Sequence, residues 1–241
     1  MSLDDLRGAV MYFTRLPGFH TSASSPDDLS RAAPWLPLVG LLIGAAVALA
    51  VWAGAHVSPS IAALLGLIVW VVITGGLHID GLGDVADALA ASHRSPDRFL
   101  EVVHDPRIGA FGVMAIALQL IAKLVLLAQI SGVASLAAII LVPVWARWGA
   151  LVLSLTVPSL AAGAGERFSQ QIDAKVVAGE ALVLAVASLW FAPALLAAFL
   201  IVPAMAAYWR HRLGAINGDC LGASIEVSET LLLLLLAVSA A

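Results

Sequence analysis

Apolar runs long enough to cross a membrane dominate the chain. A spanning helix needs about 20 mostly apolar residues, and runs of that length cover residues 33–54, 109–130 and 134–157. A shorter run covers residues 58–73, and a last one covers residues 225–241. The pattern therefore predicts an all-α fold, a polytopic bundle of membrane-spanning helices.

One further apolar run, residues 176–208, is too long for a single span and contains Pro193. Because proline interrupts a helix, we interpret this run as two short spans joined by a tight turn; one long kinked helix is the alternative. The sequence thus predicts about seven spans, with residues 1–241 forming a single integral membrane domain.

A short amphipathic helix is expected near the N-terminus, because Leu6, Val10 and Phe13 recur at helical spacing before Pro17. This helix either lies in the membrane interface or packs against the bundle. Residues 21–30, which are rich in Ser, Pro and Asp, are typical of a loop.

Composition supports insertion in a lipid bilayer. Hydrophobic residues make up 61% of the chain and charged residues 12%, whereas soluble domains carry roughly 25% charged residues. The single cysteine, Cys220, excludes an internal disulfide framework. The acidic opening of the chain does not resemble a cleavable signal peptide, and no basic patch suggests a nucleic-acid partner.

Basic residues predict the orientation. With seven spans and a cytoplasmic N-terminus, the inner segments 1–32, 74–108, 158–175 and 209–224 contain ten of the twelve Lys and Arg residues, as expected when basic loops stay in the cytoplasm. We therefore expect a multi-pass protein of the cell inner membrane. Its active site would face the cytoplasm, on the last three of these segments. Such one-sided polarity favours an enzyme over a channel or transporter.

The stretch most typical of a functional site is residues 75–87. It contains His78 and three carboxylates, those of Asp80, Asp84 and Asp87. On a helix this spacing places all three carboxylates on one face. Clustered carboxylates repel one another, and hard oxygen ligands suit Mg²⁺. The stretch therefore predicts a magnesium site, although a solvated acidic helix start explains the same spacing.

A second polar stretch leads into the next apolar run. Ser95 and Pro96 predict a helix start. Asp105 and Arg107 follow where the chain re-enters the membrane. Helix starts bind anions, and arginine can hold a phosphate through two hydrogen bonds. Arg107 is therefore a candidate for binding a phosphate.

Other charged residues lie in or beside the apolar runs. Lys123 and Arg147 fall inside expected spans, where charges are costly and usually face the bundle interior. We expect both to pair with the acidic site, although Arg147 alternatively extends its charge to the interface. Asp219, Glu226 and Glu229 place more acids on the same membrane side. Acids, arginines and glycines at one face indicate a reaction on a phosphate or diphosphate.

These motifs resemble those of the adenosylcobinamide-GDP ribazoletransferases, also called cobalamin synthases, over nearly the whole chain. The most specific are Gly-Gly-Leu-His-Ile-Asp-Gly-Leu at 75–82, continued by Asp84 and Asp87, and Asp-Pro-Arg-Ile-Gly-Ala-Phe-Gly at 105–112. Supporting pieces are Thr14-Arg15-Leu16-Pro17, Trp35, Gly218-Asp219, Glu226 and Glu229. The chain departs from the family at Gly83, Val85 and Ala88, and in Gly-Ala-Ile-Asn at 214–217. At these departures the chain lacks a threonine hydroxyl and some of the glycines that the family usually has, but it keeps the carboxylates.

The resemblance implies the last assembly step of the cobalamin nucleotide loop. A hydroxyl of α-ribazole, or of its 5′-phosphate, would attack the cobinamide-side phosphate of adenosylcobinamide-GDP; GMP would leave, and Mg²⁺ would be required. It implies that Asp80, Asp84 and Asp87 bind the metal and that His78 or a carboxylate accepts the proton. Further substrate-binding candidates are Arg107, Asp105, Arg15, Lys123, Arg147, Asp219, Glu226 and Glu229.

Two alternatives remain open. The spaced-Asp pattern also looks like that of the CDP-alcohol phosphotransferases, membrane enzymes of lipid synthesis, but this chain lacks their Ala-Arg pair after Asp-Gly. A cation transporter with intramembrane acids is the second alternative, and the sidedness of the charge argues against it. The sequence is also compatible with a homo-oligomer.

Overall fold

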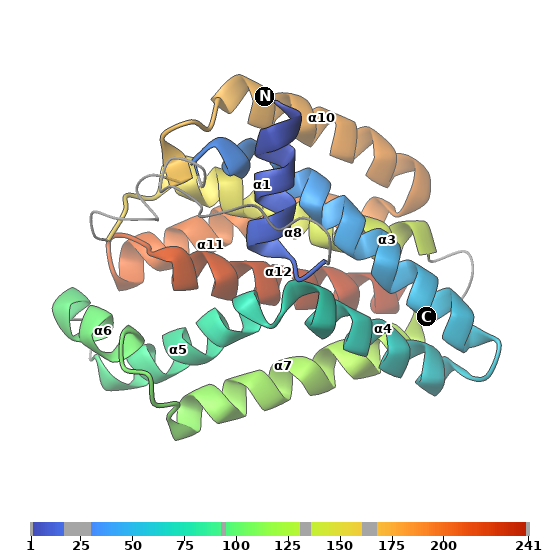
Figure 1. Ribbon diagram of the computed structural model, residues 1–241, viewed down its shortest axis with the longest axis horizontal. Coiled ribbons are helices and arrows are strands. Elements are labelled where there is room, and N and C mark those ends of the chain that lie inside the picture. The colour runs from blue at the N-terminus through green and yellow to red at the C-terminus, as the bar shows by residue number, and fades with distance from the viewer. Residues whose placement is uncertain (1, 17–29, 93–94, 131–135, 161–167, 240–241) are drawn as a thin grey trace.

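The computed structural model describes residues 2–16, 30–92, 95–130, 136–160 and 168–239. The regular elements in these ranges are helices (Figure 1), which confirms the all-α class. In chain order they are α1 (Leu3–Phe13), η1 (Ala33–Trp35), α3 (Leu36–Ala55), α4 (Pro59–Thr74), α5 (Leu77–Ala91), α6 (Pro96–Val103), α7 (Ala110–Gln129), α8 (Leu136–Thr156), α10 (Ala174–Phe191), η3 (Pro193–Ala197), α11 (Ala198–Arg212) and α12 (Gly218–Ser239). The loop expected at 21–30 lies, except for Ser30, outside the described residues.

Six stretches are long and apolar enough to cross a membrane by themselves. They are Ser30–Ala55, α7, α8, α10, Pro193–Arg212 and α12. Helices α4 and α5 meet this criterion only as a pair, and they are bent by 85° where they join. Counted as one span, the pair brings the total to seven, in agreement with the expected number.

The α4–α5 bend is produced by two glycines. Gly75 and Gly76 have φ angles of 63° and 73°, a left-handed conformation that glycine adopts without steric cost. They end α4 and redirect the chain into α5. The segment expected as the inner loop 74–108 therefore contains two helices, α5 and α6. The predicted start of α6 is confirmed, because the Ser95 hydroxyl accepts a hydrogen bond from the Arg98 amide at 3.3 Å.

The last three spans differ in how well the sequence predicted them. The break at Pro193 is confirmed, since α10 ends at Phe191 and a new helical stretch begins at the proline. The start of the last span, expected at 225, is wrong. Helix α12 begins at Gly218, where the Asn217 side chain accepts a hydrogen bond from the Cys220 amide at 2.9 Å. Glu226 therefore lies well inside the helix.

Helices α8 and α12 form the centre of the bundle. About 78% of the most apolar part of α8 and 61% of that of α12 is buried, against 17% for α10. Figure 1 shows α12 running through the middle, with α4, α5 and α7 on one side in this view and α3 and α10 on the other. Gly40 and Gly44 allow α3 to approach the backbone of α8, a small-residue spacing common between membrane helices.

We predict that Gly44→Ala destabilises the protein. A Cβ atom at Gly44 would collide with the Ile140 backbone of α8, and overpacking typically costs about 1–3 kcal/mol. Gly179→Ala on α10 is the matched control, because a Cβ atom there meets nothing within 4 Å. The free energy of unfolding in detergent should fall only for Gly44→Ala; equal values for both variants would contradict this packing.

Candidate active site

Helix α5 is held unusually close to α12. A Cβ atom on Gly81 would lie 3.1 Å from the Cα of Asp219, and one on Gly222 would lie 3.3 Å from the Cα of His78. The backbones approach each other at both points because these two positions lack side chains. Asp219, at the start of α12, is thereby brought against the face of α5 that carries Asp80 and Asp84.

The three carboxylates predicted on α5 lie together with a fourth from α12. The carboxylate of Asp84 is close enough to those of Asp80, Asp87 and Asp219 to interact electrostatically with all three. Asp219 also interacts with Asp80 and with His104. We call Asp80, Asp84, Asp87 and Asp219 the acid cluster. Asp80 is exposed and Asp84 is half-buried.

Asp87 has a structural role that the sequence did not reveal. Its carboxylate oxygens accept hydrogen bonds from the amides of Gly109 and Gly112 at 2.7 and 2.9 Å. It thus caps the start of α7 across 22 and 25 positions of sequence, with a charge that suits a helix N-terminus. A Cβ atom at either glycine would collide with this carboxylate. By contrast, the carboxylates of Asp80 and Asp84 have no hydrogen-bond partner among the described residues.

The donor chemistry of the acid cluster fits Mg²⁺. Within the described ranges, no three His, Cys, Asp or Glu side chains are placed to hold a metal ion by themselves. Mg²⁺, however, is usually bound through one or two carboxylates together with waters and substrate phosphates. Asp80 and Asp84 are the two carboxylates of the cluster with no hydrogen bond to give up.

Two arginines that the sequence analysis named as substrate-binding candidates, Arg107 and Arg15, flank this region. Arg107 lies just before α7 and forms two side-chain hydrogen bonds with Asp105, at 3.0 and 2.8 Å, which lower the pKa of that carboxyl to about 2. The Arg107 side chain is 86% exposed, so it can exchange this carboxylate for a phosphate. Arg15 donates its amide to the Ile73 carbonyl at 2.7 Å, and its side chain lies over Gly75 at the α4–α5 bend.

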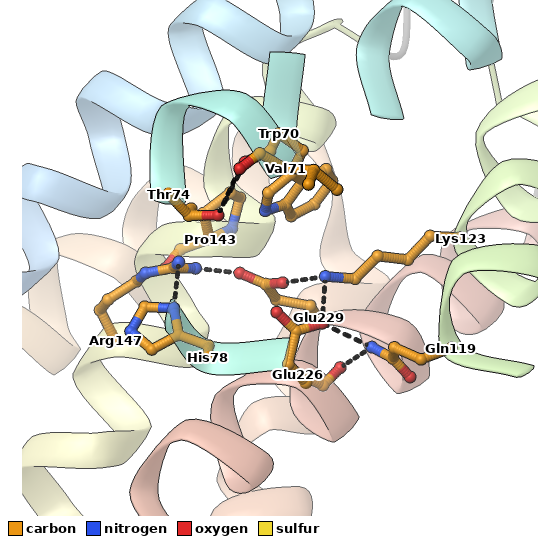
Figure 2. Close-up of polar contacts among 10 residues, drawn as sticks. All are labelled: Trp70, Val71, Thr74, His78, Gln119, Lys123, Pro143, Arg147, Glu226 and Glu229. Carbon is orange, nitrogen blue, oxygen red and sulfur yellow. Dashed lines mark hydrogen bonds and ion pairs between the residues drawn. The ribbon is translucent and has the colours of Figure 1, made fainter. Parts of the chain in front are cut away.

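A buried charge network, formed by His78, Lys123, Arg147, Glu226 and Glu229, links four helices (Figure 2). Lys123 on α7 bonds Glu226 at 2.6 Å and also bonds Glu229. Arg147 on α8 bonds the other oxygen of Glu229, and its Nη2 lies 3.1 Å from Nδ1 of His78. Two acids and two bases therefore balance in the interior of the bundle.

Further contacts support Glu226 and Lys123 in this network. The amide of Gln119 donates to the side chain and the backbone carbonyl of Glu226, at 2.9 and 2.7 Å. The ammonium of Lys123 also lies 4.5 Å from the centre of the Trp70 ring, a favourable cation–π geometry. Buried charges are tolerated only when they are paired and hydrogen-bonded in this way.

The network changes the interpretation of the charged spans. Lys123 and Arg147 were expected to pair with the acidic site, but they pair with Glu226 and Glu229 instead of the α5 carboxylates. The alternative that Arg147 extends to the interface is wrong, because this residue is fully buried. These four residues, predicted to bind substrate, thus have their charged groups engaged with one another. Of the five residues of the network, His78 lies on α5, the helix that carries Asp80, Asp84 and Asp87.

Arg147 also fixes the protonation of His78. Because a guanidinium can only donate hydrogen bonds, Nδ1 of His78 acts as the acceptor of the 3.1 Å contact. The neutral ring then carries its proton on Nε2 and has no free acceptor atom. Of the two proton acceptors predicted from the sequence, a carboxylate of the acid cluster is therefore better suited than His78.

We predict that Glu229→Gln strongly destabilises the protein, since it leaves Arg147 and Lys123 with a buried, unbalanced positive charge. Breaking a buried ion pair from one side typically costs about 3–5 kcal/mol. Glu180→Gln is the matched control. One oxygen of Glu180 on α10 is buried without a hydrogen-bond partner, so this change does not break a contact of that oxygen. If thermal unfolding in detergent shows the same midpoint for Glu229→Gln as for the wild type, the network does not stabilise the fold.

Comparisons with known proteins give the family of the chain. Residues 5–237 match the family described as cobalamin-5-phosphate synthase. A relative from Novosphingobium aromaticivorans, named adenosylcobinamide-GDP ribazoletransferase, is 46% identical over 96% of this chain and 95% of its own length. Relatives of the same name from Laribacter hongkongensis and Thiobacillus denitrificans are 48% and 43% identical, over 96% and 98% of this chain and 95% and 97% of their own lengths. No solved structure matches. The chain therefore belongs to the cobalamin-5-phosphate synthase family.

Proposed function

We propose that this protein is an adenosylcobinamide-GDP ribazoletransferase that completes the nucleotide loop of cobalamin. It transfers the cobinamide-phosphate part of adenosylcobinamide-GDP to α-ribazole or its 5′-phosphate and releases GMP. The observation that carries the proposal is the acid cluster, which gathers four carboxylates from α5 and α12 in a chain that matches the family over residues 5–237. The relatives' names supply the substrate.

The acid cluster and its neighbours have distinct roles in this reaction. Asp80 and Asp84 would bind Mg²⁺, with Asp219 close by. When bound there, Mg²⁺ would neutralise charge on the phosphate oxygens. Arg107 exchanges Asp105 for the diphosphate and holds its oxygens. A carboxylate of the cluster accepts the proton of the attacking hydroxyl.

Asp87 and His78 act mainly by holding these groups in place. Asp87 ties α5 to the N-terminus of α7, so the carboxylates keep their distance from Arg107, which lies directly before that helix. His78 connects the start of α5 to Arg147 in the bundle interior. Both contacts pre-organise the site, which is the main contribution a protein makes to phosphoryl transfer.

The protein would work in the cell inner membrane with its acid cluster toward the cytoplasm. The asymmetry of basic residues supports this orientation. The lipid phosphotransferase and the cation transporter are not favoured, because the relatives compared share one name and cover nearly the whole chain.

The test is GMP release by the purified protein in liposomes supplied with adenosylcobinamide-GDP, α-ribazole 5′-phosphate and Mg²⁺. We expect GMP and a matching corrinoid product from the wild type, and a rate lower by about 10²-fold or more for Asp84→Asn, because the variant loses a carboxylate that would hold the Mg²⁺ and with it the neutralisation of charge on the phosphate oxygens. Asp97→Asn is the matched control, since Asp97 is an exposed carboxylate on α6 outside the acid cluster.

The outcomes separate the reaction from the site. Equal GMP release by wild type and Asp84→Asn would support the proposed reaction but show that Asp84 is not part of the active site. Absence of GMP from folded wild-type protein would overturn the proposed function, and CDP-linked lipids would be the next substrates to assay.

A further inference from the structure

A cavity of about 160 Å³ lies beside the acid cluster. It is bounded by α1, α3, α5, α8 and α12, and by Phe168, which precedes α10 in the chain. Leu36, Ala150 and Ile225 form part of its wall and are each at most 3% exposed. Tyr12 also lines it and is 47% exposed. The cavity therefore extends from the surface of the protein into the bundle.

The lining of this cavity is apolar and aromatic. The rings of Phe13 and Phe168 both line it and contact each other edge to face, with centroids 6.3 Å apart. Its ionisable side chains are His78 and Asp219, apart from the Tyr12 phenol. Cavities of roughly 150 Å³ lined by aliphatic and aromatic side chains accept a benzene ring. The size and lining thus suit one small planar aromatic group.

The position of the cavity indicates what kind of molecule would carry this aromatic group. Asp219 lines the cavity and also belongs to the acid cluster. A ligand whose aromatic end fills the cavity can therefore place its polar end beside Asp219, toward Asp84. This is the arrangement needed for a nucleoside whose sugar hydroxyl attacks a phosphate held at the acid cluster.

Of the two bases in the proposed reaction, the base of α-ribazole matches this lining better. Its fused benzimidazole rings are apolar apart from one unsubstituted ring nitrogen. Guanine carries several donors and acceptors, which would lose their hydrogen bonds in an apolar cavity at a cost of a few kcal/mol. The His78 ring supplies one matching donor, because its Nδ1 faces Arg147 and its Nε2 has no partner in the described part of the chain.

We propose that this cavity binds the benzimidazole base of α-ribazole and so places the ribose hydroxyl at the acid cluster. The proposal rests on the proposed function for the identity of the nucleoside. Phe13 and Phe168 contact the base, Ala150 sets the depth of the cavity, and His78 donates to the ring nitrogen. The cavity thereby determines which base the enzyme accepts, independently of the diphosphate-binding residues.

The test is equilibrium binding of α-ribazole to the purified protein in detergent, measured by calorimetry without the second substrate. Ala150→Leu fills the buried end of the cavity. We expect it to weaken binding of α-ribazole by about 10-fold or more, since one or more excess carbon groups in a pocket change affinity by roughly 10–200-fold. The riboside of unsubstituted benzimidazole, which lacks the ring methyl groups, should lose much less. The affinity for adenosylcobinamide-GDP should not change.

This selective loss of affinity for α-ribazole is a result that a general folding defect would not produce. If Ala150→Leu does not fold, Phe168→Leu replaces it; this variant enlarges the cavity and should shift the preference toward bulkier ribosides. Unchanged affinities for both ribosides in the folded variant would overturn the proposal. Because binding is measured without turnover, that result would leave GMP release by the wild type, and with it the proposed function, untouched.

Discussion

Charge pairing inside the membrane is the constraint on which this structure depends. Lys123 on α7 and Arg147 on α8 meet Glu226 and Glu229 on α12 with less than a tenth of any of these side chains exposed. Such charges are tolerated in a bilayer only when they compensate one another. Three helices must therefore keep one relative depth, because sliding any of them by a turn would separate the pairs. Through His78 the same constraint extends to α5 and hence to the acid cluster.

Glycines allow the close approach of helices that the charge pairs do not determine. Gly81 and Gly222 bring α5 against α12, and Gly109 and Gly112 leave room for the carboxylate of Asp87 at the start of α7. The bend at Gly75 turns α5 out of line with α4, so that a polar helix begins where an apolar one ends. The proposed function depends on this combination: a row of carboxylates lies beside the start of α7, which Asp87 caps, and next to an apolar cavity.

The sequence predicted the features that are local. Apolar length predicted the spans, Pro193 predicted the break between α10 and η3, and helical spacing placed Asp80 and Asp84 on one face. It did not predict the partners of Lys123, the capping of α7 by Asp87 or the cavity, because each is a contact between segments distant in sequence. One usable signal was that the two basic residues inside expected spans, Lys123 and Arg147, are matched in number by Glu226 and Glu229 on the last apolar run. Treating Glu226 and Glu229 as the start of a helix concealed it.

The most direct test of the account is Mn²⁺ binding followed by electron paramagnetic resonance, because Mn²⁺ suits the same oxygen ligands as Mg²⁺. The measurement would use the full-length protein in detergent with adenosylcobinamide-GDP present. We expect bound Mn²⁺ in the wild type and in Asp97→Asn, and its loss in both Asp80→Asn and Asp84→Asn. Unchanged Mn²⁺ binding by folded Asp80→Asn and Asp84→Asn would show that the acid cluster of α5 is not the metal site, and the account of phosphate transfer there would be contradicted.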